Sequence, residues 1–133
     1  ISCSLVGSEM CIRDRNICCM QECRVNILGT EYEILYVKES EDAMLKNVDG
    51  YMDPYTKQIV VALIEADEKT TKNQTDYYKH TLRHEIVHAF LYESGLWCDS
   101  STKDAWGVSE EITDWIALQF PKMMKAFQEV GAL

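Results

Sequence analysis

Two histidines and a glutamate lie at a spacing that suits metal chemistry. His84 and His88 are four residues apart, and Glu85 directly follows the first of them. Residues four apart on a helix share one face, so both imidazoles can bind one metal ion. Glu85 is turned by about 100° from His84, which places its carboxylate beside the ion, where it can take a proton from a water molecule. The pattern predicts a zinc-binding helix with Glu85 as general base.

The alternative is an ordinary core helix whose histidines are held by neighbouring hydrogen bonds. The residues around the motif are apolar nearly all round, which predicts a buried helix: Leu82, Ile86, Val87, Ala89, Phe90 and Leu91. Polar groups on such a helix need partners. Two histidines together with a glutamate favour metal binding over this alternative.

A third metal ligand must come from elsewhere in the chain. His80 lies eight residues before His88, about 12 Å along a helix, whereas zinc donors lie within about 2.3 Å of the ion. His80 is therefore expected to flank the site or to support one of the ligands from behind. Because the chain has no further histidine, the third ligand must be a carboxylate or Cys98. The metzincin pattern is excluded, since Ser94 stands where it has histidine.

The segment 109–115 supplies a carboxylate. Glu110 and Asp114 are four residues apart on one helical face. Two histidines and one glutamate leave a position open for water, and an aspartate could accept the free N–H of a ligating histidine. Alternatively, Ser109 caps the helix, and the two glutamates only favour its positive end. The upstream motif favours Glu110 as ligand, and Glu111, turned by about 100°, is expected at the core edge or in solvent.

These residues together resemble a known pattern. His84-Glu85-Ile86-Val87-His88 followed by Glu110-x-x-x-Asp114 is similar to the gluzincin motif, and residues 20–133 resemble the ImmA/IrrE-like metallopeptidases of phages, mobile elements and bacterial hosts. The resemblance implies zinc bound by His84, His88 and Glu110, with Glu85 as general base and Asp114 orienting a histidine. It also implies a protein or peptide substrate, such as a transcriptional repressor. The chain departs from that family in carrying no helix-turn-helix pattern and no clear N-terminal helix.

Two other classes of function stay open. A non-catalytic, zinc-containing interaction or regulatory protein of a phage or mobile element would keep the metal ligands, and a metal-free helical protein would use the histidines only in its core. A residue that stabilises the oxyanion is not evident from the sequence. Tyr77, Tyr78 and Tyr92 are candidates by position.

The strands are expected in the first half of the chain. Residues 23–37 are rich in β-branched and aromatic residues and predict a hairpin that turns at Gly29-Thr30. Residues 51–65 predict a second strand pair that turns at Asp53-Pro54. A short helical turn is expected between them.

The helices are expected in the second half. One runs from an N-cap at Asp76 to Glu93 and ends at Gly95. A loop follows over 98–107, and then a helix over 108–119 with an apolar stripe of Val108, Ile112, Trp115 and Ile116. Pro121 kinks that helix or opens a last one. We therefore expect an α+β fold: a minimal zincin-like domain with a small twisted sheet packed on the motif helix.

Composition limits the other possibilities. A chain of 133 residues, 47% hydrophobic, fits one domain. The net charge of −9 argues against nucleic acid and against an anionic membrane as direct partners. Neither a membrane-spanning stretch nor the order of a signal peptide is present, so we expect a cytoplasmic protein.

The N-terminal residues stand apart from the rest. Five of the six cysteines lie within residues 1–23, where they cannot staple distant segments, and their spacing matches no zinc knuckle. Residues 1–15 resemble a translated sequencing-adapter read-through. We expect 1–19 to be non-native or disordered and 20–133 to form the metallopeptidase domain.

Overall fold

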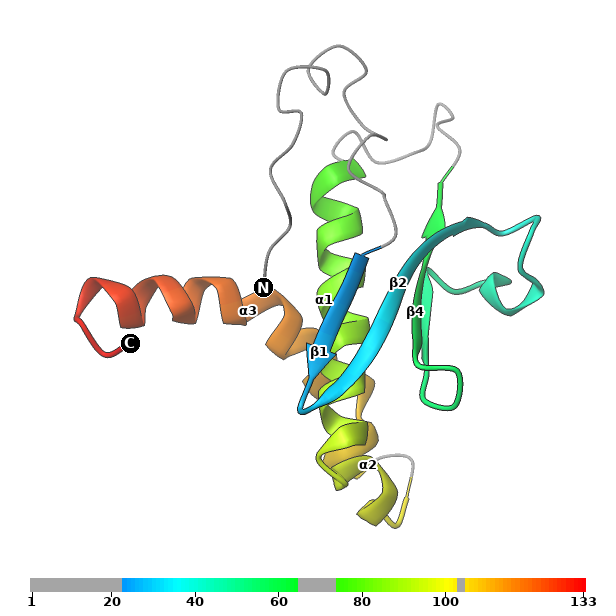
Figure 1. Ribbon diagram of the computed structural model, residues 1–133. Coiled ribbons are helices and arrows are strands. Elements are labelled where there is room, and N and C mark those ends of the chain that lie inside the picture. Colours follow the sequence, from blue (N-terminus) through cyan, green and yellow to red (C-terminus); the bar gives the residue numbers. More distant parts are fainter. Residues whose placement is uncertain (1–22, 65–73, 103–104) are drawn as a thin grey trace.

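A computed structural model describes residues 23–64, 74–102 and 105–133. The described residues form an α+β fold with one four-stranded mixed sheet and three helices (Figure 1). The expectations for residues 1–19 lie outside these ranges. The elements are β1 (Cys23–Ile27), β2 (Thr30–Lys38), a 3₁₀ turn (Ala43–Leu45), β3 (Gly50–Asp53), β4 (Gln58–Leu63), α1 (Gln74–Glu93), α2 (Leu96–Asp99), a second 3₁₀ turn (Trp106–Val108) and α3 (Glu110–Glu129).

The sheet has the strand order β1-β2-β4-β3. The outer pairs are antiparallel hairpins and β2 runs parallel to β4, so both predicted strand pairs are confirmed. The first turn lies at Leu28-Gly29, one residue earlier than expected. Both of these residues have positive φ, as a two-residue hairpin turn of the favoured hand requires, and the side chain of Asn26 accepts the Gly29 N–H at 3.0 Å.

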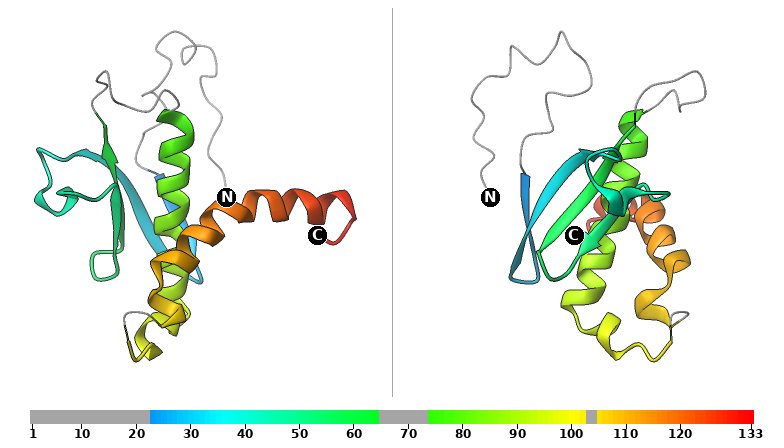
Figure 2. Two further views of the ribbon diagram at one scale, coloured as in Figure 1. Left: turned by 180° about the vertical axis from the view of Figure 1, so that it is seen from behind. Right: turned by 90° about the vertical axis from the view of Figure 1, so that its right-hand side faces the viewer.

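The helix α1 lies along one face of the sheet, as the two views in Figure 2 show. The core between them contains Ile27, Tyr32, Ile34 and Ile59 from the strands and Ala89 from α1. The opposite face is covered in part by the first 3₁₀ turn, whose Leu45 packs on Val60 and Ala62. Burial on both faces explains why β4 is a continuous apolar run rather than an alternating one.

A partly buried cluster of polar groups joins the end of α1 to the sheet. The carboxylate of Glu93 accepts hydrogen bonds from the hydroxyls of Thr30 (2.8 Å) and Tyr32 (2.7 Å) and pairs with Lys57 Nζ (2.7 Å). The ammonium of Lys57 also lies over the rings of Tyr32 and Tyr92. These contacts fix the register of α1 on the strands.

The helix boundaries in the middle of the chain agree with the expectation only in part. Within the described residues α1 begins at Gln74, so Asp76 lies in its first turn and does not cap it. Gly95 does end the helix, with φ at 84° in the left-handed region. The expected loop over 98–107 is shortened by α2 and the second 3₁₀ turn. Phe90, expected in the core, is 43% exposed because no described element covers that side of α1.

The helix α3 begins at Glu110, where the Ser109 hydroxyl accepts the Ile112 N–H at 3.4 Å. Its buried residues are Thr113 and Ala117, whereas Trp115 of the expected stripe is 54% exposed. The helix continues through Pro121 and changes direction near its middle, so its second half extends away from α1 (Figure 2). Proline removes one helical hydrogen bond and crowds the preceding turn, which accounts for a bend.

None of the helices among the described residues has the length and apolar character needed to cross a membrane.

Candidate metal centre

The motif helix and the start of α3 bring three ligand atoms together. His84 Nε2 lies 2.9 Å from Glu110 Oε2 and 3.0 Å from His88 Nε2, and His88 Nε2 lies 3.2 Å from the same glutamate oxygen. The histidines share a face because they are one helical turn apart. The structure therefore brings together the three residues that the sequence analysis selected as metal ligands.

The spacing of these three atoms fits a tetrahedral ion. Zinc–nitrogen bonds of about 2.0–2.1 Å imply ligand atoms about 3.3–3.4 Å apart at tetrahedral angles. The observed separations of 2.9, 3.0 and 3.2 Å form a nearly equilateral triangle close to that size. The group could hold a divalent metal ion.

The two other candidates for the third ligand lie elsewhere. Glu111 is exposed and belongs to neither ligand group found among the described residues, and Cys98 is an exposed, free cysteine on α2. Glu110 combines two roles that the sequence analysis treated as alternatives. Its helix is capped by Ser109, and its own side chain still turns back toward the histidines. Because Ser109 fixes where α3 begins, it also fixes the direction in which the Glu110 side chain points.

Glu85 lies beside the ligands and is buried. Its residue is only 6% exposed, and the backbone N–H of Met52 donates to its carboxylate. Burial, reinforced by the negative charge of Glu110, raises the pKa of Glu85 from 4.5 to about 8, although the Met52 hydrogen bond opposes the shift. A carboxyl group with a pKa near neutrality can both accept and release a proton at physiological pH.

The contact with Glu85 follows from the position of β3 at the edge of the sheet. The Ala62 N–H donates to the backbone carbonyl of Asp49. In an antiparallel pair every second residue bonds to the partner strand, so Gly50 and Met52 turn their backbone groups away from β4, to the free edge of the sheet. A Cβ on Gly50 would lie 2.7 Å from Val60 O and 3.0 Å from Thr81 Cγ2. Glycine at this position lets β3 pack closely against α1.

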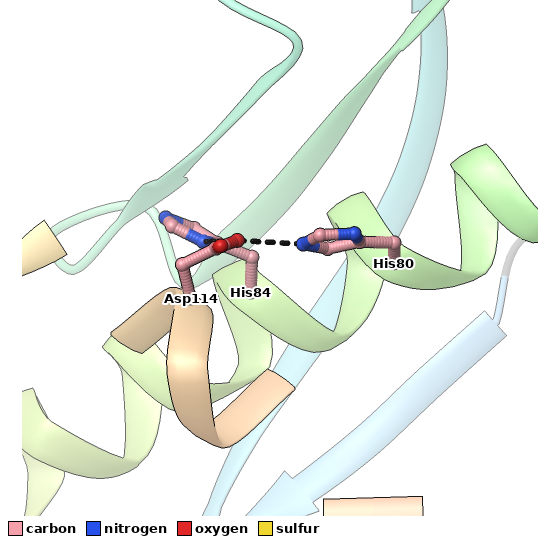
Figure 3. Close-up of side chains that lie close together, drawn as sticks. All are labelled: His80, His84 and Asp114. Carbon is pink, nitrogen blue, oxygen red and sulfur yellow. Dashed lines mark hydrogen bonds and ion pairs between the residues drawn. The ribbon is translucent and has the colours of Figure 1, made fainter. Parts of the chain in front are cut away.

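Asp114 lies behind the candidate ligand His84. Figure 3 shows its carboxylate between the rings of His80 and His84. Its Oδ1 is 2.6 Å from His80 Nε2 and 3.5 Å from His84 Nδ1. The hydrogen bond from His80 is the main reason why the pKa of Asp114 is lowered. The expected placement of Asp114 next to a candidate ligand histidine is thus observed. His80 was expected to flank or support the site, but its bond to Asp114 was not predicted, because it depends on how α1 crosses α3.

His88 is held in a different way. Its Nδ1 is buried and has no hydrogen-bond partner among the described residues, and its ring packs edge-on against Trp97 with centroids 5.3 Å apart. Burial lowers the pKa of His88, which favours the neutral imidazole that metals bind. Trp97 carried no signal in the sequence, since α2 read as part of a loop.

The ligands open into a cleft of about 530 Å³ between β3, α1 and α3. Its walls include Tyr51, Met52, Tyr77 and Trp97. Of the three tyrosines proposed for the oxyanion, only Tyr77 lines this cleft, and its hydroxyl is hydrogen-bonded to Asp49. Tyr78 instead accepts the Ile64 N–H, and Tyr92 packs against Trp97.

No protein-family model, curated protein or solved structure was found to match this chain. The chemistry of the cleft is therefore the basis for inferring a function.

Proposed function

We propose that this protein is a zinc-dependent metallopeptidase of the gluzincin type. The observation that carries the proposal is the convergence of His84 Nε2, His88 Nε2 and Glu110 Oε2 within 3.2 Å of one another, with the buried carboxyl of Glu85 alongside. Two histidines and one glutamate are the ligand set of catalytic zinc sites that keep one position open. A structural zinc site would use four protein ligands, and the group among the described residues offers three.

Zinc held by these residues would polarise the scissile carbonyl and lower the pKa of a water molecule. The remaining steps belong to the chain. Glu85 takes the proton of the attacking water and delivers it to the leaving amine. Burial raises the pKa of Glu85 in the metal-free protein, which favours a carboxyl that can hold a proton as well as take one up.

The edge strand β3 offers a place for the substrate backbone. An extended peptide laid along β3 would pair with the outward backbone groups of Gly50 and with the Met52 carbonyl, as strands add to an open sheet edge. This arrangement would place the peptide across the cleft next to Glu85. A protein or peptide in extended form is therefore the substrate class we propose.

On this proposal the domain is a minimal zincin-like unit, and the likeness to ImmA/IrrE-like metallopeptidases in the motif residues makes a repressor-type protein the first substrate to test. The support for this finer statement is the pattern His84-Glu85-x-x-His88 with Glu110-x-x-x-Asp114.

The test has two parts. Protein purified without chelator is expected to contain about one zinc ion per chain by elemental analysis, since it supplies one such ligand set. It should also cleave peptides in a quenched-fluorescence library, and this hydrolysis should stop with Glu85→Gln although the zinc content is unchanged. Absence of stoichiometric divalent metal would overturn the proposal. Full zinc content without any cleavage would instead favour the non-catalytic zinc protein.

A further inference from the structure

Asp114 is shared by two histidines, only one of which is a candidate ligand. His80 Nε2 and His84 Nδ1 both approach the same oxygen, Oδ1, at 2.6 and 3.5 Å (Figure 3). His80 and His84 come from successive turns of α1, and Asp114 comes from α3. The Asp114 side chain is 45% exposed, so its carboxylate would be free to turn toward solvent without the bond to His80.

These three residues are also close enough to be considered as a second metal group. Their distances do not suit that role. Zinc ligands should lie about 3.3–3.4 Å apart, whereas the short contact of 2.6 Å has the length of a charge-assisted hydrogen bond. The group is therefore a chain of polar contacts, with a short hydrogen bond between His80 and Asp114 and a longer contact of 3.5 Å between Asp114 and His84 Nδ1.

The chain has a chemical consequence for His84. An ionised carboxylate can only accept hydrogen bonds, so each ring nitrogen that faces Asp114 must carry a hydrogen. Neutral His84 with its hydrogen on Nδ1 has its lone pair on Nε2, the atom that faces Glu110 and His88. Asp114 thus favours the tautomer of His84 that is able to bind a metal ion. Without an ion, the Glu110 carboxylate at 2.9 Å favours a hydrogen on Nε2 instead and competes with Asp114.

We propose that His80 is a positioning residue of the metal centre: its hydrogen bond holds Asp114 against His84 Nδ1 and so presents His84 Nε2 to the ion. The inference rests on the proposed function, since it assumes that His84 binds the metal ion. The effect of Asp114 on the tautomer of His84 can be measured without metal and without catalysis.

The tautomer can be read in the metal-free protein once Glu110, which competes for a hydrogen on His84 Nε2, is replaced by alanine. In this Glu110→Ala background, two-bond ¹H–¹⁵N correlation spectra should show His84 predominantly as the Nδ1–H form, and as a mixture of both forms when His80→Leu is added. His80→Gln can place an amide N–H near the position of Nε2, so it should restore the Nδ1–H spectrum. Arg83→Met is the matched control: it removes the 2.7 Å bond from α1 to Ala117 O on α3 but leaves Asp114 untouched.

Zinc affinity measured by competition with a chromophoric chelator supplies the second readout. Losing a residue that orients a ligand costs about 10–100-fold in metal affinity, so we expect that loss for Asp114→Leu and a smaller one, about 3–10-fold, for His80→Leu. In the Asp114→Leu background, His80→Leu should have no further effect, because it acts through Asp114.

An unchanged tautomer and unchanged zinc affinity in His80→Leu would overturn the inference. Equal losses in His80→Leu and Arg83→Met, without rescue by His80→Gln, would also overturn it, since they would reflect only the docking of α3 on α1. If the wild type did not bind zinc, the proposed function would fail, and the spectra of the metal-free Glu110→Ala proteins would still decide the role of His80.

Discussion

Glu85→Gln should make the metal-free protein more resistant to unfolding as the pH rises, compared with the wild type. The Glu85 carboxyl is buried, and its pKa is raised from 4.5 to about 8 in the folded state. Folding therefore favours the protonated form. The stability that this group contributes is complete below pH 4.5 and is lost as the pH rises toward 8, because ionising the buried carboxyl costs free energy only in the folded protein.

The size of the effect follows from the two pKa values. Each unit of difference corresponds to about 1.4 kcal/mol, so between pH 5 and pH 7 the wild type should lose about 2–3 kcal/mol of unfolding free energy through Glu85 alone. Glutamine cannot ionise and can still accept the Met52 N–H. The difference in unfolding free energy between variant and wild type should therefore grow by about 2–3 kcal/mol across this range.

The assay is urea denaturation of chelator-treated protein at several pH values, followed by circular dichroism. Groups that titrate in both proteins cancel in the difference. Glu111→Gln is the control, since it removes one negative charge from the exposed side of α3 and should leave the difference constant. A difference that does not change with pH for Glu85→Gln would show that Glu85 is not held in a desolvated pocket, and the argument for its role as proton acceptor and donor would fall with it.

Three further variants test other parts of the structure. Glu110→Ala should weaken zinc binding by more than about 100-fold. Glu111→Ala should only lower the stability of the protein, by about 0.3–1 kcal/mol, because a negative charge at the helix N-terminus is lost. Calorimetric titration with zinc distinguishes the two variants, and the reverse order of affinities would show that the helix phase is wrong. Gly50→Ala should destabilise the protein by about 1–3 kcal/mol and slow hydrolysis, because its Cβ would lie 2.7 Å from Val60 O; wild-type stability by denaturation would mean that β3 can move away from α1 at little cost. Glu93→Gln should destabilise the protein by about 1.5–3 kcal/mol, because the contacts of this side chain to its three donors are weakened. An unchanged melting temperature would show that this polar cluster does not fix α1 to the sheet.

The sequence predicted the parts of the site that depend on local geometry. His84, Glu85 and His88 lie on one helix, so their relative placement follows from the helical repeat alone. Glu110 was selected by its phase relative to Asp114, and its contact with both histidines agrees with that choice. That these residues bind zinc stays a prediction.

Contacts between separate elements were less accessible to the sequence. The bond from His80 to Asp114 depends on the crossing of α1 and α3, which no periodicity encodes. Gly50 could be taken for a turn residue, although its role is to let β3 approach α1 closely. Trp115 was placed in an apolar stripe, but a pattern shows only which side chains could be buried, and no described element covers this one.

The three candidate ligands come from two different helices, and this has a consequence for how a metal centre would assemble. The histidines stand on α1, which is fixed to the sheet by an apolar core and by Glu93, whereas the described part of α3 packs mainly on α1 through few buried residues. Amide protons of α3 should therefore exchange with solvent faster than those of α1 in the metal-free protein, since local opening of α3 exposes little apolar surface. Capture of an ion would then begin on the two histidines and finish when Glu110 closes on it, so that α3 gains protection from exchange while α1 changes little.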